Sequence, residues 1–145
     1  MPKFNFNLQK LLDYKDILLK EEISKIQQLN TQIEDCQEKI SGINNRMNAL
    51  GQAIETKGRD TLQIEVLIGY KRYINDLNGL KSSFTKQKNN MELILDKTRN
   101  KAISLQKEHK TIDLLKEKKF YEFKKEQEYQ EQSLLDDLVC MRRTI

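Results

Sequence analysis

Apolar residues recur at every seventh position along the first third of the chain. One series consists of Leu12, Leu19, Ile26, Ile33, Ile40, Met47 and Ile54. A second series, three residues later, consists of Leu29, Cys36, Ile43 and Leu50. Leu8 stands earlier on this second series, and polar Lys15 and Glu22 lie between. Because the a and d positions of a coiled coil have this spacing, the pattern predicts a helix over about residues 8–55.

The repeat stops near residues 55–61. Gly58 can adopt the left-handed conformation that ends a helix, and Asp60 can cap the next helix with Gln63 three residues further on. We therefore expect a turn over about residues 56–60.

A second heptad repeat follows the expected turn. Its a-type series is Tyr70, Leu77, Phe84, Met91, Thr98, Leu105 and Ile112. Its d-type series is Val66, Tyr73, Leu80, Gln87, Ile94, Lys101, Glu108 and Leu115. Glycine and proline are absent after Gly79, so the second helix is expected to run from about residue 61 to about residue 140.

A short loop between two helices makes them antiparallel neighbours. Folding at Gly58 would pair positions whose numbers sum to about 116, so that Leu50 meets Val66 and Lys15 meets Lys101. The predicted fold is all-α: one domain over residues 1–145, a long antiparallel two-helix coiled-coil hairpin with unequal arms. About 25 residues at the C-terminus would extend beyond the pairing, partly covered by Phe4 and Phe6.

Composition agrees with this fold and excludes several others. The chain of 145 residues is 33% charged and contains only five Gly and one Pro, too few for the many turns of a β-sandwich. No apolar run approaches the roughly 20 residues of a membrane span, and the N-terminus lacks a signal-peptide core. We therefore expect a cytoplasmic protein.

Residues for catalysis or metal binding are not grouped in the sequence. Cys36 and Cys140 form no CxxC pair, and His109, the only histidine, is expected to face solvent on a helix. Phosphate-binding and nucleophile motifs are absent. We expect no enzyme activity, no cofactor, no metal and no small-molecule substrate.

Three segments are candidate binding surfaces. The first lies beside the turn and contains Tyr70, Tyr73, Leu77, Leu80 and Phe84, which could equally fill the seam between the helices. The second, residues 99–125, has nine Lys/Arg against four Asp/Glu and contains Phe120, Tyr121 and Phe123. The third, residues 126–137, has five carboxylates and no basic residue. It ends in Leu134, Leu135 and Leu138, and leucines without a partner in the hairpin imply contact with another protein or self-association.

Three segments resemble the FliJ proteins of the bacterial flagellar type III export apparatus. They are FNFNLQKLLD at residues 4–13, LIGYKRYINDL at residues 67–77 and EQSLLDDL at residues 131–138, the last followed by Arg142 and Arg143. The order and spacing of these segments, over nearly the whole chain, carry the resemblance. Asp137 stands where many relatives have Glu.

The resemblance implies a non-enzymatic coiled-coil stalk, similar to the terminal helices of the rotary ATPase gamma subunit. Its expected partners are the hexameric export ATPase, the export-gate membrane protein and export chaperones, at the inner membrane below the flagellum. By this resemblance, the export gate would contact Tyr70, Tyr73, Leu77, Leu80 and Phe84. The ATPase ring or another partner would contact Phe120, Tyr121, Phe123, Leu134, Leu135, Asp136 and Leu138.

Two other functions fit the same residues. The sequence pI of about 9.0 and the basic stretch would suit a nucleic-acid-binding coiled coil, although nucleic acid is not the expected partner. A generic structural coiled coil could instead dimerise into a four-helix bundle.

Overall fold

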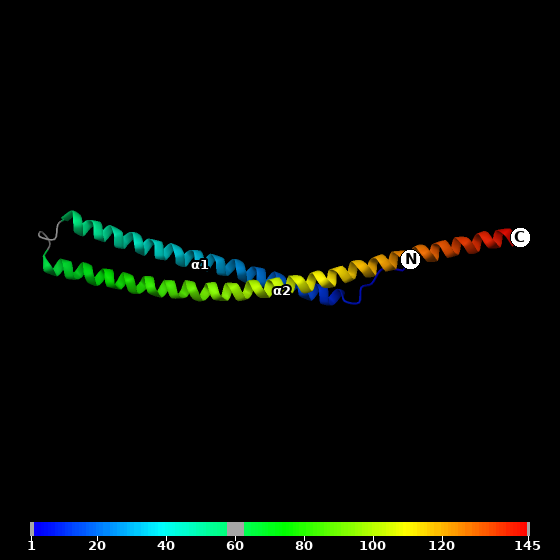
Figure 1. Cartoon of the computed structure of the whole chain (residues 1–145), viewed down its shortest axis with the longest axis horizontal. Coiled ribbons are helices and arrows are strands. Elements are labelled where there is room, and N and C mark those ends of the chain that lie inside the picture. The colour runs from blue at the N-terminus through cyan, green and yellow to red at the C-terminus, as the bar shows by residue number, and fades with distance from the viewer. Residues whose placement is uncertain (1, 58–62, 145) are drawn as a thin grey trace. The chain divides into compact units, whose positions relative to one another are not determined.

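The computed structural model describes residues 2–57 and 63–144, and both segments are dominated by one helix each. Helix α1 is Gln9–Lys57, with 49 residues, and helix α2 is Ile64–Thr144, with 81 residues (Figure 1). The chain is an all-α helical hairpin, and the prediction of two packed helices of unequal length is confirmed. The predicted turn, with Gly58 and Asp60, lies outside the described residues.

Backbone carbonyls before each helix satisfy its first amide groups. The amide of Gln9 donates to the Phe6 carbonyl at 3.1 Å, and the amides of Val66 and Leu67 donate to the Gln63 carbonyl at 3.0 and 3.2 Å. In α2 the charges also suit the helix dipole, because Glu65 lies in its first turn and Arg142 and Arg143 lie in its last.

The chain divides into two compact units, and each helix contributes to both. One unit is Glu22–Lys101, and the other combines Met1–Glu21 with Ala102–Ile145. We call them the central unit and the terminal unit. The expectation of a single domain over residues 1–145 stays a prediction.

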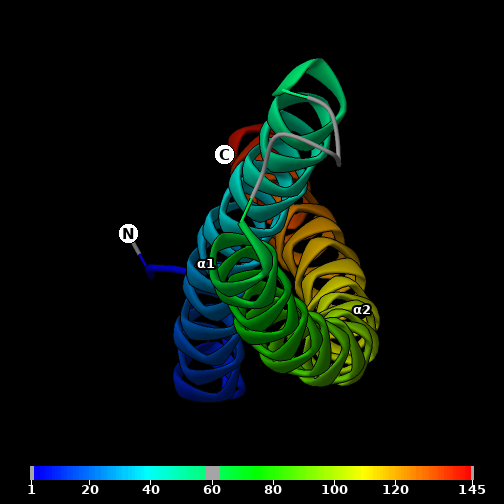
Figure 2. The ribbon, with the colours of Figure 1, turned by 90° about the vertical axis from the view of Figure 1, so that its left-hand side faces the viewer.

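In the central unit the two helices run antiparallel with a register that several contacts define (Figures 1 and 2). Glu22 Oε1 lies 3.2 Å from Lys101 Nζ, and Lys39 Nζ lies 5.2 Å from the centroid of the Phe84 ring. Both pairs have residue numbers that sum to 123. In the terminal unit Lys15 and Glu108, whose numbers have the same sum, form an ion pair of 2.6 Å.

The predicted sum of about 116 is therefore wrong by one heptad. Leu50 lies near Tyr73 rather than Val66, and Lys15 pairs with Glu108 rather than with Lys101. The shift keeps apolar positions opposite apolar positions, and it replaces a lysine–lysine layer by layers of opposite charge. Apolar spacing alone could not distinguish these two registers.

The inner face of α1 consists of the two predicted series, and of their members only Leu8, just before the helix, is exposed. On α2 the Tyr70 series is also buried or half-buried, as predicted. The predicted d-type series is wrong, because Val66, Tyr73, Leu80, Ile94 and the other members of this series are exposed. A different series takes its place, consisting of Ile74, Lys81, Lys88, Leu95, Ala102, His109, Lys116 and Phe123. Lysines can occupy such positions by burying their aliphatic stems and extending their ammonium groups to water. Because the prediction counted only apolar residues, it did not identify a series that contains several lysines.

Replacing Leu77 by Ala should destabilise the hairpin strongly, because this side chain is only 3% exposed in the central unit. The expected loss is about 2–4 kcal/mol in the free energy of unfolding, from urea denaturation followed by circular dichroism. Leu93→Ala is the matched control. Because Leu93 is 62% exposed, its replacement should lower the free energy of unfolding by less than about 0.5 kcal/mol. Equal losses in the two variants would contradict the assigned seam.

Candidate protein-binding surfaces

Within the described residues, the features that could bind a partner are open surfaces of the hairpin. None of the described His, Cys, Asp and Glu side chains gather in a group that could hold a metal ion. Among the described helices, none has a stretch long and apolar enough to span a membrane. The candidate surfaces are therefore a groove in the central unit and two patches in the terminal unit.

The groove lies between α1 and α2 in the central unit. One hollow is lined by Lys39, Gly42, Ile43, Arg46, Leu77, Leu80 and Phe84. A second hollow, lined by Arg46, Ala49, Leu50 and Tyr73, shares Arg46 with the first. Gly42 has open space where a side chain would be, which leaves the floor of the groove accessible. We call these two hollows together the central groove; its floor is apolar and its α1 rim carries two cations.

The structure divides the five residues predicted to contact the gate into two groups. Leu77 is buried, and Tyr70 and Phe84 are half-buried, so these three belong to the seam. Tyr73 and Leu80 are 42% and 51% exposed and stand on the flank of the seam, within the central groove. The side chains available to a partner are therefore Tyr73 and Leu80.

The terminal unit contains an aromatic cluster that joins the N-terminal segment to α2. The ring centroid of Phe4 lies 5.2 Å from that of Phe120 and 5.5 Å from that of Phe123, and Phe6 is buried. Tyr121 points elsewhere and is exposed, with Lys125 Nζ 4.8 Å from its ring centroid. Of the three predicted aromatic binding residues, Phe120 and Phe123 thus contact the chain's own N-terminal segment.

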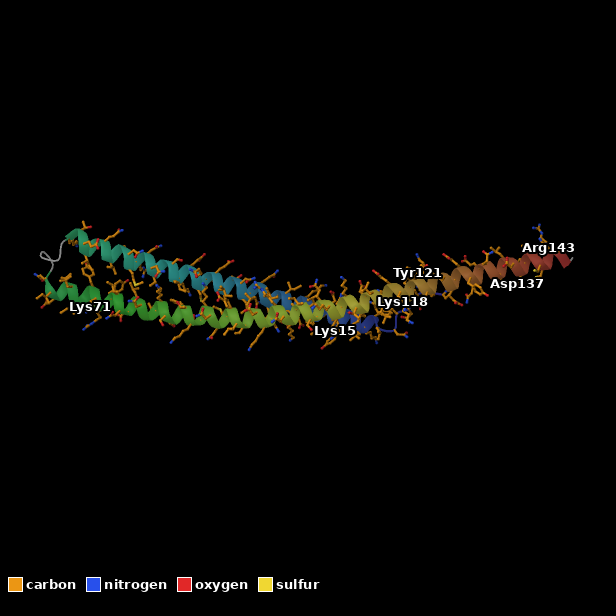
Figure 3. The ribbon with its side chains drawn as sticks, viewed as in Figure 1. Lys15, Lys71, Lys118, Tyr121, Asp137 and Arg143 are labelled. Atoms are coloured by element: carbon orange, nitrogen blue, oxygen red, sulfur yellow. The ribbon has the colours of Figure 1, made fainter. Side chains whose placement is uncertain are left out.

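Beyond the aromatic cluster, residues 128–143 of α2 are exposed throughout. The apolar side chains Leu134, Leu135 and Leu138 here flank the adjacent carboxylates Asp136 and Asp137. In Figure 3, Asp137 and Arg143 lie on this stretch, beside which no other described segment of the terminal unit runs. We call residues 128–143 the terminal stretch, and its leucines, exposed together, suit a protein partner.

Sequence reasoning missed a patch on the first turns of α1. Leu11, Tyr14 and Ile17 are exposed large apolar residues of the terminal unit. They lie outside both heptad series. Large apolar residues outside the repeat are expected on the exposed face of the helix, and this signal could have identified the patch. Lys39 and Arg46, on the rim of the central groove, were also missed.

One carboxylate of the central unit is buried in the seam. The Glu22 side chain is only 6% exposed, and its Oε1 lies 3.2 Å from both Lys25 Nζ and Lys101 Nζ. Burial raises the pKa of Glu22, but the hydrogen bonds and charges of these two lysines outweigh it and leave the pKa below its ordinary value. The carboxylate is thus ionised at neutral pH.

His109 was predicted to face solvent, and this is wrong. Its side chain is half-buried on the inner face of α2, with Nε2 3.9 Å from Asp16 Oδ1 in the terminal unit. Position 109 belongs to the inner series that the apolar count had not selected.

These observations define a coiled-coil protein in which both units of the helical pair expose apolar side chains. The family model described as Flagellar FliJ protein matches residues 4–143 of this chain. The chain therefore belongs to the flagellar FliJ family and is a component of flagellar export. The family is non-catalytic, which supports the expectation that this chain is not an enzyme. Neither the curated proteins nor the solved structures gave a match to the chain.

The stabilising effect of Glu22 should depend on pH. Because its pKa is lowered on folding from 4.5, the ionised side chain stabilises the hairpin above about pH 4.5, and this contribution disappears as the pH falls through the folded pKa. The free energy of unfolding of the wild-type protein should be about 1–2 kcal/mol higher than that of Glu22→Gln at pH 7, with a smaller difference at pH 3. Urea titrations at several pH values measure this difference. A difference that stays constant from pH 7 to pH 3 would contradict the assigned ion pairs.

Proposed function

We propose that this protein is a stalk of the flagellar export apparatus, linking the hexameric export ATPase to the export-gate membrane protein. Membership of the FliJ family supports a role in export, and the surfaces described above support contact with two partners. The observation that carries the proposal is that both units expose large apolar side chains, among them Tyr73 and Leu80 in the central unit and Leu134, Leu135 and Leu138 in the terminal unit.

The central groove is the proposed site for the export gate. Tyr73 and Leu80 expose apolar surface there, and Lys39 and Arg46 supply positive charge on the opposite rim. A partner segment with an apolar ridge and acidic flanking residues would complement such a groove. The proposed contact residues are therefore the exposed Tyr73 and Leu80. Leu77, which is buried in the seam, would support the groove without contacting the partner.

The terminal unit is the proposed site for the ATPase ring. Its terminal stretch offers Leu134, Leu135 and Leu138, and the start of α1 offers Leu11 and Tyr14. A single hairpin placed among six identical subunits would contact each of them differently. Such unequal contacts favour some conformational states over others, which would bias ATP hydrolysis or ring assembly.

Assistance to export chaperones completes the proposed role. The terminal stretch is long and amphipathic enough to present a helix face to more than one partner. Binding to the ATPase and to the export gate would place the protein in the cytoplasm, peripherally associated with the inner membrane.

Polar replacement of the terminal leucines should disrupt contact with the ATPase. Leu134→Ser combined with Leu138→Ser removes two exposed leucines without altering the seam, so binding to the purified ATPase should weaken at least about ten-fold. Co-sedimentation and the rate of ATP hydrolysis measure the effect. Leu93→Ser is the matched control, since Leu93 and Leu134 are both 62% exposed. Unchanged binding in the double variant would exclude the terminal stretch as the contact.

A second pair of substitutions should separate the gate from the ATPase. Tyr73→Ser with Leu80→Ser alters the central groove and leaves the terminal unit unchanged. Binding to the soluble domain of the gate protein should fall at least about ten-fold, while binding to the ATPase stays within about two-fold. Pull-down with each purified partner provides the measurement. Loss of both interactions together would contradict the assignment of separate surfaces.

A further inference from the structure

We infer that Glu22 fixes the register of the central unit and thereby determines which residues form the central groove. Glu22 is the only charged residue among the buried side chains of the described chain. Its contacts, with Lys25 on the same helix and Lys101 on α2, join the two helices at one level. The role of Glu22 in fixing the register is independent of the proposed function. Only its consequence for gate binding rests on the proposed function.

The apolar residues of the central unit permit two registers. In the observed register Leu50 lies near Tyr73, and Ile43 shares a hollow with Leu80. Displacing α2 by one heptad would bring the half-buried Leu67 and Ile74 to the levels that Ile74 and Lys81 now occupy. Both arrangements place apolar side chains at the same levels, so hydrophobic burial distinguishes them weakly.

The charged residues distinguish the two registers clearly. In the displaced register Glu22 would lie level with Ile94 and lose Lys101, leaving Lys25 as its only described cation. A buried carboxylate that loses a charged partner is strongly disfavoured, because its desolvation is no longer compensated. The displacement therefore removes the ion pair that joins Glu22 to α2.

The register decides the composition of the central groove, although Glu22 does not line it. Ile43 lies 21 positions after Glu22, about 31 Å along an α-helix. In the displaced register Leu80 would move level with Cys36, and the hollow beside Arg46 would be bordered by different α2 residues. Glu22 is therefore a positioning residue, which acts on the groove through the alignment of two helices.

The native thiol of Cys36 provides a direct test of the register. With Cys140 replaced by Ser, a cysteine at inner position 88 would lie opposite Cys36 in the observed register, where Lys88 reaches the neighbouring Gln37, and one at inner position 81 would do so in the displaced register. Under mild oxidation of the full chain, Lys88→Cys should form an intramolecular disulfide readily and Lys81→Cys should not. Non-reducing electrophoresis and peptide mass analysis identify the products.

Charge reversal then tests the role of Glu22. Adding Glu22→Lys should lower the disulfide yield of the Lys88→Cys variant relative to that of the Lys81→Cys variant by about ten-fold, and adding Lys101→Glu as well should restore it. Glu21→Lys is the matched control, because it makes the same charge change at the exposed neighbouring position and should leave both yields unchanged. Rescue by the second charge separates pairing from a general loss of structure.

Several outcomes would overturn the inference. One is an unchanged ratio of the two disulfide yields when Glu22→Lys is added, and another is a failure of Lys101→Glu to restore the ratio. If Glu22→Lys loses its helical circular dichroism, Glu22→Gln replaces it, and an unchanged ratio in that folded variant also overturns the inference.

Binding of the gate domain is measured on Glu22→Lys and on its rescue by Lys101→Glu, with Lys81 and Lys88 left in place. A register that shifts while gate binding stays constant contradicts the gate assignment but leaves the role of Glu22 intact. A register that does not shift contradicts the role of Glu22, whatever the gate does.

Discussion

A pairing of two helices can bury only one narrow stripe of each, and the rest of this molecule follows from that limit. Even Leu77, the best-buried apolar side chain among the described residues, retains a little exposure, and no described large side chain is completely enclosed. The seam therefore stabilises the helices while leaving every large side chain of the described residues in partial contact with solvent. Residues next to the stripe, such as Tyr73 and Leu80, must remain partly exposed whatever their polarity. In such a fold, apolar surface available for partners arises wherever the sequence supplies more apolar residues than the seam can accommodate.

Polar groups have a separate role within this seam. Lys81 and Lys88 occupy inner positions of α2, and Lys88 reaches Gln37 at 2.5 Å, so aliphatic stems supply part of the packing while the charged ends reach polar partners. The Glu22 carboxylate is different because it is buried and holds two lysines at once. A buried ion pair contributes modestly to stability, since desolvation opposes it, but it penalises every arrangement that separates the charges. Stability and alignment thus come from different residues of one seam.

Assignment to the flagellar FliJ family gives these surfaces a context in protein export. The surfaces differ in chemistry: the central groove is apolar with a cationic rim, whereas the terminal stretch places leucines among carboxylates. Phe4 and Phe6 add a third element, because the N-terminal segment covers part of the aromatic face of α2. Two surfaces of unlike charge suit two different partners, which is the property that a linking protein requires.

The sequence by itself determined the two helices, their unequal lengths, the inner face of α1 and one inner series of α2, because heptad spacing of apolar residues leaves few alternatives. It also drew attention to Tyr73, Leu80 and the terminal leucines, but it could not separate these from seam residues such as Leu77 and Phe84. Only the tertiary structure decided the register, the second inner series of α2 and the inward position of His109. The physical reason is that a heptad repeat looks the same after a shift of seven residues. Apolar side chains are nearly interchangeable under that shift, and the ion pairs of Glu22 and Lys15, which are not, become visible only when the helices are placed together.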